Sequence, residues 1–558
     1  MKKSIGILLI LALAAGCGKD NPSGEGGGGG GSSTVPKNWT ISGTVSGNDG
    51  HLLKDVVVSD GLNCVKTNEE GRYYLDSDMT STEYVFVSTP SEYGAPVVDG
   101  QACFWKFLKD CTKGSDGKYV IDFTLEKNTS PERFTIFIYG DPQPRPASAG
   151  LDKVGYSSLA CCTDMYRDMK EYAAGIKGRR VYGIGLGDIV HQSLSLLTQY
   201  KKGMSTTGIS TYNIIGNHDQ EHVLERSDEE ASKNFVAQMG PVNYSFNLGG
   251  LHFLMLDNMI AQGPGSGKYS DECTTGLTDK IWQWVQNDMA HVPTTTPIMV
   301  CGHSPMMRTE GSTSDRSGLH LGDLRNLLSR YPKAYAWAGH THTTYNFVDK
   351  DKPVIETHTV TRVTGALWIN DYLGSNGTPR GYVVFDYDNG KVSWKFKPTY
   401  YQTAPYIGTN GNPVSGSAPD YKWRDWNYDA QGRAVLKSTG QPLDDTYQMQ
   451  VYPPGTYGDN YLYANVFLWD ELWKTPVFTS NSEQSVMRRV TDKDYRYSYG
   501  HWDLYSFYSS NKSIGSEFTP SKNNCSSMFR VYVEAAHGSG TVSVKDRFGN
   551  THTSSITW

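Results

Sequence analysis

The sequence has few cysteines and no excess of basic charge, and its N-terminal apolar run is short. It holds only nine cysteines in 558 residues, too few for a fold that depends on a disulfide framework. The formal net charge is −6, and without a basic excess no nucleic acid is expected as a partner. The apolar run of residues 5 to 15 is too short for a permanent membrane helix. A chain of this length is expected to form roughly two to four domains.

The cysteines do not predict a disulfide scaffold. Eight remain when Cys17 is considered separately, and their spacing does not assign pairs. Cys103 and Cys111 are the best candidates for a local disulfide, whereas the adjacent Cys161 and Cys162 cannot easily bridge each other. We expect most of the eight to be buried free thiols.

The first residues have the pattern of an export signal. Two lysines precede the apolar run, and residues 13 to 17, Leu-Ala-Ala-Gly-Cys, resemble a bacterial lipoprotein signal. The resemblance implies that Cys17 becomes the acylated N-terminus; a plain signal peptide with an incidental cysteine is the alternative. Residues 1–17 are therefore a predicted signal peptide and the Gly-rich residues 18–36 a flexible tether. We expect a lipid-anchored protein of the bacterial cell envelope, periplasmic or on the outer-membrane surface, with no membrane contact besides the anchor.

Residues 37–128 predict an all-β domain. Short alternating strands, separated by Gly, Asn and Asp turns, are expected at residues 39–45, 56–58, 71–75 and 84–87. Residues 58–61 and 67–73 resemble the transthyretin-like or carboxypeptidase-regulatory-type sandwich. This resemblance implies a spacer or positioning module, and the domain shows no catalytic set of residues.

From Arg133 onwards, strands alternate with helices. Apolar runs predict strands at residues 134–139, 181–186, 211–215, 251–256, 297–300 and 334–338, with a helix near 157–176. Such nearly continuous apolar strands imply an α/β sheet that is covered on both faces. Two further strands, at residues 381–386 and 391–397, are expected to complete the sheets of a catalytic domain spanning 129–398.

Five short polar motifs lie at or just past the ends of these strands. They are Gly-Asp-Pro-Gln (140–143), Gly-Asp (187–188), Gly-Asn-His-Asp (216–219), Gly-His (302–303) and Gly-His-Thr-His (339–342). In open α/β folds, ligands collect beyond the carboxyl ends of the strands. Carboxylate, imidazole and amide-oxygen ligands suit Mn²⁺, Fe or Zn²⁺. The motifs therefore predict a metal site at one edge of the sheet.

The motifs contain enough ligands for two divalent cations. Two cations about 3.5 to 4 Å apart need a bridging anion, and Asp188 in the central position is the candidate. Asp141 and His342 can complete one metal site. The other site can be completed by Asn217, His303 and His340.

The ordered motifs resemble those of the calcineurin-like metallophosphoesterase family over residues 133 to 398. The resemblance implies a sandwich of two sheets flanked by helices, with a dinuclear site on the loops. It implies these metal ligands: Asp141, Asp188, Asn217, His303, His340 and His342. A hydroxide held between the two metals would attack phosphorus. The adjacent His218 is implied as the catalytic residue that protonates the leaving group.

Two positions depart from the family pattern. Gln143 stands where a His ligand is usual; its amide oxygen can still coordinate, but the first metal is expected to bind less tightly. His191 stands where many members have an Asp that orients the catalytic His, and Asp219 or a main-chain group is a candidate substitute. His191 is a candidate substrate contact or a surface His. Arg308 is a candidate contact for substrate anions or an ordinary loop residue.

Residues 399–558 predict a C-terminal β-rich domain. Alternating patterns suggest strands at residues 461–468, 529–534 and 541–544. The segment resembles the β-domain that accompanies some bacterial calcineurin-like proteins. It is expected either to pack on the catalytic domain or to bind a surface glycan.

Together these features predict a metal-dependent phosphoesterase. The expected reaction is hydrolysis of a phosphomonoester or phosphodiester substrate by a metal-bridged hydroxide, with two divalent ions as cofactors. The alternative is a surface glycan-binding or scaffolding lipoprotein whose phosphoesterase domain has lapsed. Gln143 and His191 favour this alternative, whereas the other intact ligands oppose it.

Overall fold

The structure is a computed structural model, which describes part of the chain. The described residues are 35–146, 158–308, 314, 316–365, 374, 376–399, 426–437, 440–456, 458–490, 525–534 and 536–558. The predicted signal peptide, Cys17 and nearly all of the tether lie outside them, so lipidation and location stay predictions. Within the described residues, no helix has the length and apolar character needed to cross a membrane. The chain divides into two units, Met1–Lys37 and Asn38–Trp558, and the helices and strands of the described residues belong to the second unit.

The N-terminal domain is the predicted β-sandwich. One sheet contains β1 (Ile41–Gly47), β4 (Arg72–Leu75), β6 (Tyr93–Gly94), β10 (Tyr119–Val120) and β11 (Phe123–Lys127). The other contains β2 (Val57–Ser59), β3 (Cys64–Lys66), β5 (Tyr84–Ser88) and β9 (Trp105–Phe107), which precedes the short helix η1 (Leu108–Asp110). Alternate residues such as Val45, Val58 and Leu75 meet in one apolar core, as the alternating pattern requires.

A hairpin of this N-terminal region belongs to the seven-stranded central sheet. Strand β8 (Gln101–Ala102) pairs in parallel with β14 (Ser210–Asn213), and β7 (Val97–Val98) follows at the sheet edge. The backbone N–H of Thr211 donates to the carbonyl of Gly100 at 2.9 Å. The N-terminal region therefore shares this sheet with strands of the central domain.

Two sheets form the central domain. The seven-stranded sheet has the order β24 (Lys391–Pro398), β23 (Gly381–Asp388), β12 (Arg133–Tyr139), β13 (Arg180–Gly185), β14, β8 and β7. The six-stranded sheet has the order β15 (Tyr244–Leu248), β16 (Leu251–Leu256), β19 (Ile298–Gly302), β20 (Ala334–Ala338), β22 (Ile355–Thr359) and β21 (Tyr345–Val348). Strands β12 to β14 are parallel, as are β16, β19, β20 and β22.

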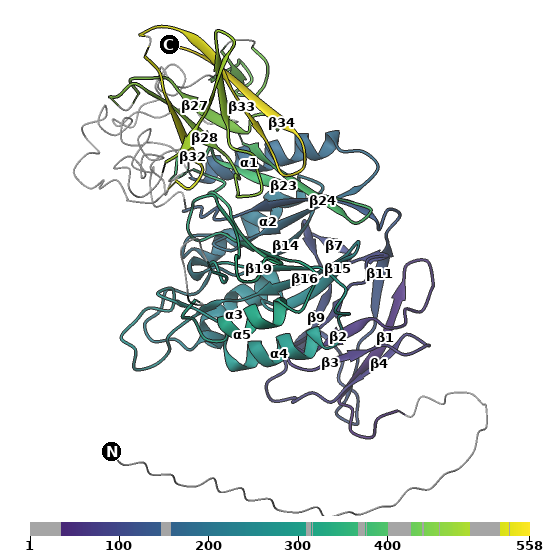
Figure 1. Ribbon diagram of the computed structural model, residues 1–558. Helices are drawn as coiled ribbons and strands as arrows, with labels where there is room; N and C mark the ends of the chain where they lie inside the picture. Colours follow the sequence, from purple (N-terminus) through teal and green to yellow (C-terminus); the bar gives the residue numbers. More distant parts are fainter. Residues whose placement is uncertain are drawn as a thin grey trace, which may run out of the picture. The chain divides into compact units, whose positions relative to one another are not determined.

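Helices cover the two sheets. They are α1 (Ser158–Gly175), α2 (Leu197–Ser205), α3 (Asp228–Met239), α4 (Asp279–Met289) and α5 (Leu321–Leu328). Apolar residues of α1, α2 and α3 pack with Phe137 and Tyr139 of β12, whose neighbours Ile136 and Ile138 share a core with β16. Figure 1 shows α1 and α2 on one side of the sheets and α4 and α5 on the other. This is the predicted sandwich between helices, and it explains why β16, β19 and β20 are buried throughout.

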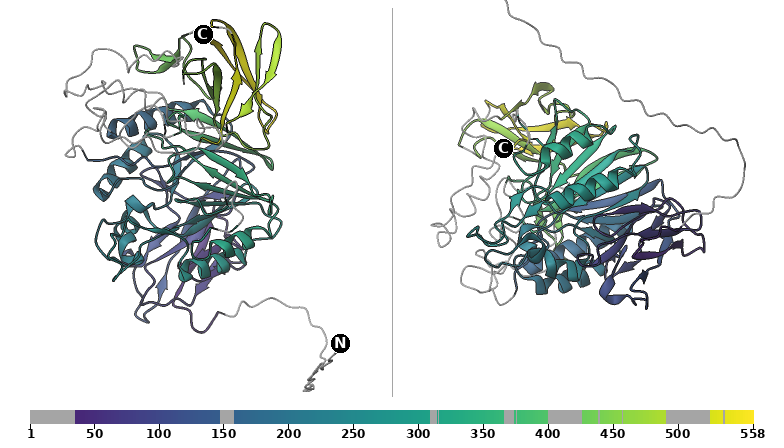
Figure 2. Two further views of the ribbon diagram at one scale, coloured as in Figure 1. Left: turned by 60° about the vertical axis from the view of Figure 1, so that its left-hand side comes forward. Right: turned by 90° about the horizontal axis from the view of Figure 1, so that it is seen from below.

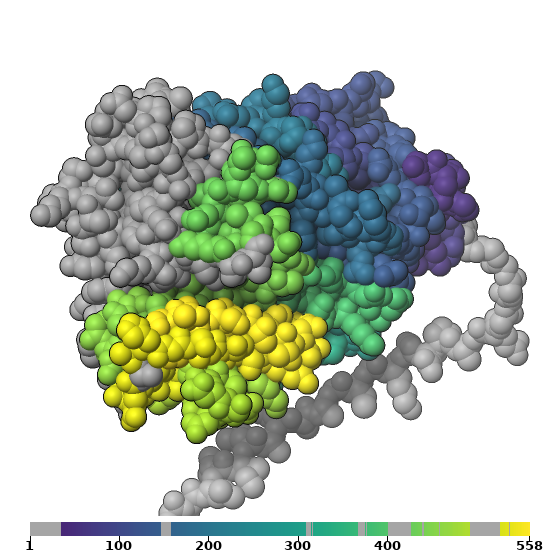
Figure 3. Space-filling view, turned by 90° about the horizontal axis from the view of Figure 1, so that it is seen from above, coloured from purple at the N-terminus to yellow at the C-terminus, as the bar shows by residue number. Residues whose placement is uncertain are grey.

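The C-terminal domain is β-rich, as predicted. Besides the hairpin of β25 (Trp426–Tyr428) and β26 (Ala434–Leu436), it has two four-stranded sheets. One contains β27 (Met449–Tyr452), β28 (Tyr461–Val466), β31 (Arg488–Arg489) and β32 (Met528–Tyr532). The other contains β29 (Val477–Ser480), β30 (Glu483–Val486), β33 (Ser539–Lys545) and β34 (Thr551–Thr557). The C-terminal strands β33 and β34 form part of the yellow surface in Figure 3.

The C-terminal domain packs on the central sheets, which was one of its two expected roles (Figure 2). The guanidinium of Arg547 donates to both carboxylate oxygens of Glu356 in β22, at 2.7 and 2.8 Å, and to Asp470 at 2.9 Å. The ring of Phe548 lies edge-on to Trp394 of β24, with centroids 4.7 Å apart. Glu356 is buried, so its ion pair with Arg547 joins the two domains away from water, whereas Asp470 belongs to the same domain as Arg547. Glycan binding by this domain stays a prediction.

The predicted disulfide between Cys103 and Cys111 is wrong. Both are free thiols, as are the other six cysteines of the described residues, and four of the eight are buried. Residues eight apart in sequence had suggested a local pair, but Cys103 follows β8 and Cys111 follows η1. The fold is therefore held by its apolar cores without covalent cross-links in the described residues.

Candidate metal centre

The five motifs meet at one edge of the two sheets. Strands β12, β13 and β14 of one sheet, and β19 and β20 of the other, each end at or just before a motif. Two sets of side chains have potential ligand atoms within 4.8 Å of one another: Asp141, Asp188 and His342, and Asp188, His303 and His340. Asp188 belongs to both sets. The bridging role of Asp188 between two metals stays a prediction.

Asp188 is the buried centre of these contacts. Its Oδ1 atom lies 3.3 Å from Nε2 of His303 and accepts the backbone N–H of His218 at 2.9 Å. Its Oδ2 atom accepts the side-chain amide of Gln143 at 2.6 Å. Although burial favours protonation, the charge of His303 holds the pKa of Asp188 well below its ordinary value. Asp188 therefore carries a negative charge between the two sets.

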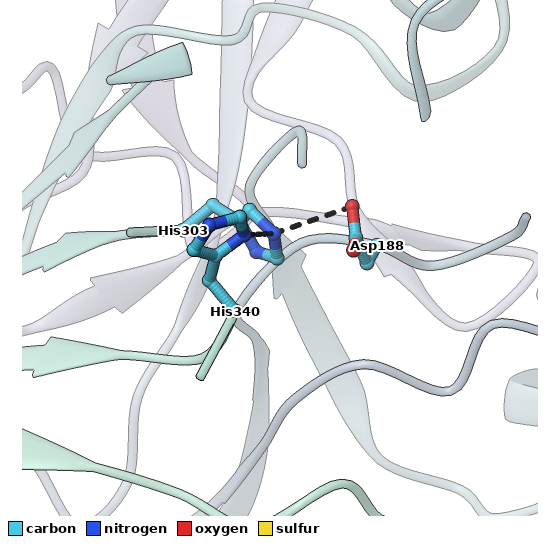
Figure 4. Close-up of side chains that lie close together, drawn as sticks. All are labelled: Asp188, His303 and His340. Carbon is cyan, nitrogen blue, oxygen red and sulfur yellow. Dashed lines mark hydrogen bonds and ion pairs between the residues drawn. The ribbon is translucent and has the colours of Figure 1, made fainter. Parts of the chain in front are cut away.

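His303 and His340 provide two imidazoles for the second set. Nδ1 of His303 donates to the carbonyl of Leu186 at 2.7 Å, which orients the ring so that Nε2 faces Asp188. Nδ1 of His340 is 3.2 Å from this Nε2 atom, and Figure 4 shows both rings beside Asp188. Loss of hydration and the charge of His303 lower the pKa of His340 to about 4. His340 is therefore neutral at pH 7, as a metal ligand must be.

Asp141 and His342 provide the first set together with Asp188. Nε2 of His342 lies 3.2 Å from Oδ1 of Asp141, and the backbone N–H of His340 donates to both carboxylate oxygens, at 3.1 and 3.0 Å. Gln143 is fully buried beside them. Its amide nitrogen, rather than its oxygen, faces Asp188 in the structure.

The orientation of the Asn217 amide indicates that the side chains of this site fit a metal ion. Its amide nitrogen donates to the carbonyl of Asp271 at 3.1 Å, whereas its Oδ1 atom is buried and has no hydrogen-bond partner among the described residues. An unsatisfied buried acceptor costs about 1–3 kcal/mol, and coordination to a cation would remove that cost. The nearby carboxylates and imidazoles are ligands of the same hard or borderline divalent ions. The site therefore fits a pair of divalent cations.

The backbone around the ligands is strained. Five of the predicted ligands have left-handed φ angles: Asp141 (55°), Gln143 (42°), Asp188 (50°), His340 (61°) and His342 (56°). A non-glycine residue in this region costs on the order of 1–3 kcal/mol, and such residues cluster at functional sites. Because the strained residues are the predicted ligands, we infer that the backbone of these loops directs the ligand side chains toward one another.

Glycines in the motifs allow the loops to approach each other. A Cβ atom on Gly216 would lie 2.2 Å from Oδ1 of Asp188, and one on Gly339 would lie 2.4 Å from Oδ2 of Asp141. Both distances are shorter than any tolerable contact. The Gly-Asn and Gly-His pairs of the sequence therefore reflect close packing of one ligand loop on the next.

Arg362 holds the first ligand loop and was missed by the sequence analysis. Its guanidinium is fully buried and donates to the carbonyls of Asp141 (3.0 Å), Pro142 (3.3 Å) and Gln143 (3.1 Å). Thr364 adds a hydrogen bond to the carbonyl of Pro142 at 2.9 Å. A lone Arg some twenty residues after the last motif gives no signal in the sequence.

We expect Arg362→Met to weaken both the fold and metal binding. Three carbonyls would lose a donor, so the free energy of unfolding should fall by about 3 kcal/mol. Because the loop orients Asp141, metal affinity should fall about 10- to 100-fold. Chemical denaturation and calorimetric metal titration measure these changes. Arg133→Met, which removes an exposed ion pair with Asp388, is the matched control. Unchanged metal affinity in Arg362→Met would show that the loop holds its shape without this residue.

The residues around His218 are arranged differently from the family pattern. The ring of His191 lies against the ring of His218, with centroids 4.2 Å apart. Asp219, a candidate for orienting His218, instead accepts the backbone N–H groups of Ile189, Val190 and Gly216 at 2.9 to 3.0 Å. It therefore ties two ligand loops together. The carboxylate that faces His218 comes from Asp271, whose Oδ2 atom is 3.8 Å from Nδ1.

The two predicted substrate contacts lie in different surroundings. His191 is next to His218, and burial and that neighbour lower the pKa of His191 to about 4. Arg308 forms an ion pair with Asp351, and its carbonyl accepts the hydroxyl of Thr357 at 3.1 Å. A role in substrate binding therefore stays a prediction for both residues.

A cavity of about 630 Å³ adjoins the loop that follows His303. It is lined by Ile260, Thr274, Thr275, Arg316, Ser317, Gly318, Leu319 and Leu321. Strands β17 (Met259–Ile260) and β18 (Thr274–Thr275) form one wall. The hydroxyl of Thr275 donates to Ser304 at 2.8 Å, which connects this wall to the centre.

Two family models match this chain, one near each end of the unit Asn38–Trp558. Residues 39–128 match the N-terminal domain of calcineurin-like phosphoesterase, and residues 425–552 match the C-terminal domain. The chain carries both terminal domains of the calcineurin-like phosphoesterases. Strands β12 to β24 and the candidate metal centre lie between the two matched segments.

Solved structures with a similar chain include several phosphatases and nucleotidases. A dimetal phosphatase from Danio rerio is 11% identical, covers 47% of this chain and 95% of its own, and has a TM-score of 0.35. A purple acid phosphatase from yellow lupin (Lupinus luteus) seeds is 14% identical, covers 62% and 67%, and has a TM-score of 0.33. A putative 5'-nucleotidase from Staphylococcus aureus is 10% identical, covers 76% and 90%, and has a TM-score of 0.30. No curated protein matches the chain.

Proposed function

We propose that this calcineurin-like phosphoesterase hydrolyses a phosphomonoester or phosphodiester with two divalent ions of Mn, Fe or Zn. The observation that carries the proposal is the position of Asp188 in both sets of potential ligands. The strained loops and the unsatisfied Oδ1 atom of Asn217 support it. The cavity beside Ser304 has room for the organic part of a substrate.

Two divalent cations held here would polarise the phosphate oxygens and lower the pKa of a water molecule between them. The side chains of the centre would bind the cations, donate a proton and contact the substrate. Asp141, Asp188, Asn217, His303, His340 and His342 would hold the cations, with Gln143 as a weaker ligand. His218 is 25% exposed and lies next to Asn217, so it can donate a proton to the leaving oxygen. His191 and Arg308 are proposed substrate contacts.

Metal analysis combined with a substrate comparison tests this function. We expect purified protein with added Mn²⁺ to release nitrophenol from mono- or bis-nitrophenyl phosphate, and the preferred compound distinguishes a monoesterase from a diesterase. A chelator should remove the activity, and added metal should restore it. Absence of bound metal and of turnover on every phosphate ester tried would leave the lapsed, glycan-binding or scaffolding protein as the better account.

Gln143→His is expected to strengthen the first metal site. An imidazole nitrogen is a stronger donor to these ions than an amide oxygen, so affinity for the weaker metal should rise, on the order of tenfold. Elemental analysis and metal titration measure the change. Gln143→Leu offers no ligand and should move affinity in the opposite direction. Equal metal content in all three proteins would remove Gln143 from the ligand set.

We further propose that Cys17 carries a lipid anchor at the bacterial cell envelope. The lipoprotein-like residues 13 to 17 and the glycine-rich tract that follows support this location. Cys17→Ala is expected to shift the protein from the membrane fraction to the soluble fraction after cell lysis. Retention of the variant in membranes would mean that another segment holds it there.

A further inference from the structure

Asp271 touches both side chains of the Asn-His pair in the third motif. It lies 54 residues after Asn217, between β17 and β18. Its backbone carbonyl accepts the amide of Asn217 at 3.1 Å, and its carboxylate lies 3.8 Å from Nδ1 of His218. The Asp271 side chain is only 7% exposed. One buried residue from a distant loop therefore contacts a proposed ligand and the proposed proton donor together.

We propose that Asp271 is the positioning residue of this centre, setting the direction of the Asn217 amide and of the His218 ring. The inference rests on the proposed phosphoesterase function and adds to it how the proton donor is aimed. In this proposal, Asp271 supplies the orienting carboxylate that the family usually has at the position of His191.

The contact with Asn217 determines which end of its amide faces the metals. Because Nδ2 donates to the carbonyl of Asp271, Oδ1 must point the other way, where it is buried without a hydrogen-bond partner among the described residues. An amide that rotated freely would present its NH₂ group to the cations half of the time. Asp271 thus orients the ligand through its backbone.

The contact with His218 acts through charge. Nδ1 of His218 is buried and makes no hydrogen bond among the described residues, so the carboxylate of Asp271 faces a nitrogen that water does not reach. A carboxylate at this position holds the ring in one orientation. Distances of this kind often shorten when substrate binds.

Two other segments hold the carboxylate of Asp271. His222 donates from Nδ1 to its Oδ1 atom at 2.8 Å, and the Gln192 amide donates to its Oδ2 atom. The ring of His222 is stacked on Tyr269, with centroids 4.3 Å apart and planes 5° apart. The backbone N–H of Gln192 also donates to the carbonyl of His218 at 2.9 Å. The carboxylate is therefore held in place, as a positioning group must be.

The test compares two substrates in Asp271→Asn, using the full chain loaded with Mn²⁺. This variant keeps the backbone carbonyl and the side-chain volume but removes the charge. An alkyl phosphate needs a proton on its leaving oxygen, whereas 4-nitrophenyl phosphate does not. We expect kcat to fall about 100-fold for the alkyl ester and less than about tenfold for the nitrophenyl ester, with KM and bound metal unchanged. Asp271→Glu should recover part of the lost kcat for the alkyl ester.

Asp279→Asn is the matched control, because Asp279 is an exposed Asp that also pairs with a histidine, His320, at 2.8 Å. It should leave both rates unchanged. Equal losses for the two esters in Asp271→Asn, or loss of metal, would overturn the proposal in favour of a structural anchor.

A readout that does not need turnover separates this inference from the proposed function. The ¹⁵N resonances of the His218 ring, assigned with the help of His218→Asn, should shift in Asp271→Asn and remain unchanged in Asp279→Asn. Unchanged resonances in Asp271→Asn would overturn the positioning role. A wild-type protein without any turnover would instead refute the proposed function, and the resonances would still decide whether Asp271 orients His218.

Discussion

Asp188→Asn is expected to lose both metals and nearly all activity, with kcat/KM at least about 10³-fold lower. Asp188 is the one side chain common to both sets of potential ligands, and its negative charge is what allows two cations to lie close together. A neutral amide at this position cannot offset two positive charges. The charge of Asp188 also raises the pKa of His303 to about 10 against the effect of burial, and this attraction would be lost.

The variant should still fold, which makes the experiment informative. Asp188 has a φ of 50°, and Asn is among the residues that tolerate this left-handed conformation best. Asp99→Asn is the matched control, because Asp99 has the same φ of 50° but lies exposed between β7 and β8. Elemental analysis, phosphate release and thermal melting measure the three properties. A variant that kept two metals would show that Asp188 does not bridge them.

The arrangement of strands could be predicted because the central strands are apolar runs, and five of them, β12, β13, β14, β19 and β20, end at or just before a glycine motif. Strand β16 covers residues 251–256, the range that the sequence predicted, and β20 covers the predicted 334–338. In parallel strands, carboxyl ends meet at one edge, so the order of the motifs was enough to bring Asp141, Asp188 and His303 together. The pattern of polar residues after apolar runs thus predicted both the order of the strands and the candidate ligands.

Contacts between distant segments without a local pattern could not be predicted. Arg362 meets the carbonyl of Asp141 across 221 positions, and Asp271 meets His222 across 49. A buried Arg or Asp looks the same in sequence as an exposed one, so nothing in either neighbourhood indicates its partner. Strands β7 and β8 have only two residues each, which is too short to produce a periodic signal. Their place in the seven-stranded sheet therefore could not be predicted from the sequence.

The strain in the ligand loops gives a physical reason why these supporting residues exist. Left-handed backbone at Asp141, Gln143 and Asp188 is unfavourable by itself, so surrounding contacts must offset it. Arg362 bonds the carbonyls of Asp141 and Gln143, and Asp219 bonds the backbone that follows Asp188. The candidate ligands can be recognised in the sequence as motifs. The residues that hold the ligand loops, such as Arg362 and Asp219, do not share a common motif, because only the fold brings them to these loops.

His218→Asn is expected to reduce kcat about 10²- to 10⁴-fold while bound metal stays nearly unchanged. The contact of His218 with Asp188 is made by its backbone N–H, at 2.9 Å, and therefore survives the substitution. What is lost is the imidazole, which lies beside Asn217 and is a quarter exposed to an incoming substrate. The decline should be larger for alkyl phosphates than for nitrophenyl phosphate, because only the former need a proton on the leaving oxygen.

His320→Asn serves as the control for this variant, because His320 pairs with Asp279 and Asp323 at the surface. Its kinetics should match those of the unsubstituted protein. Metal content and the rates for both classes of ester distinguish the possible roles of His218. Loss of metal in His218→Asn would make His218 a ligand, and an unchanged rate would mean that another group protonates the leaving oxygen. Equal declines for both esters would point to substrate binding, since a proton donor must act most strongly where the leaving group is poorest.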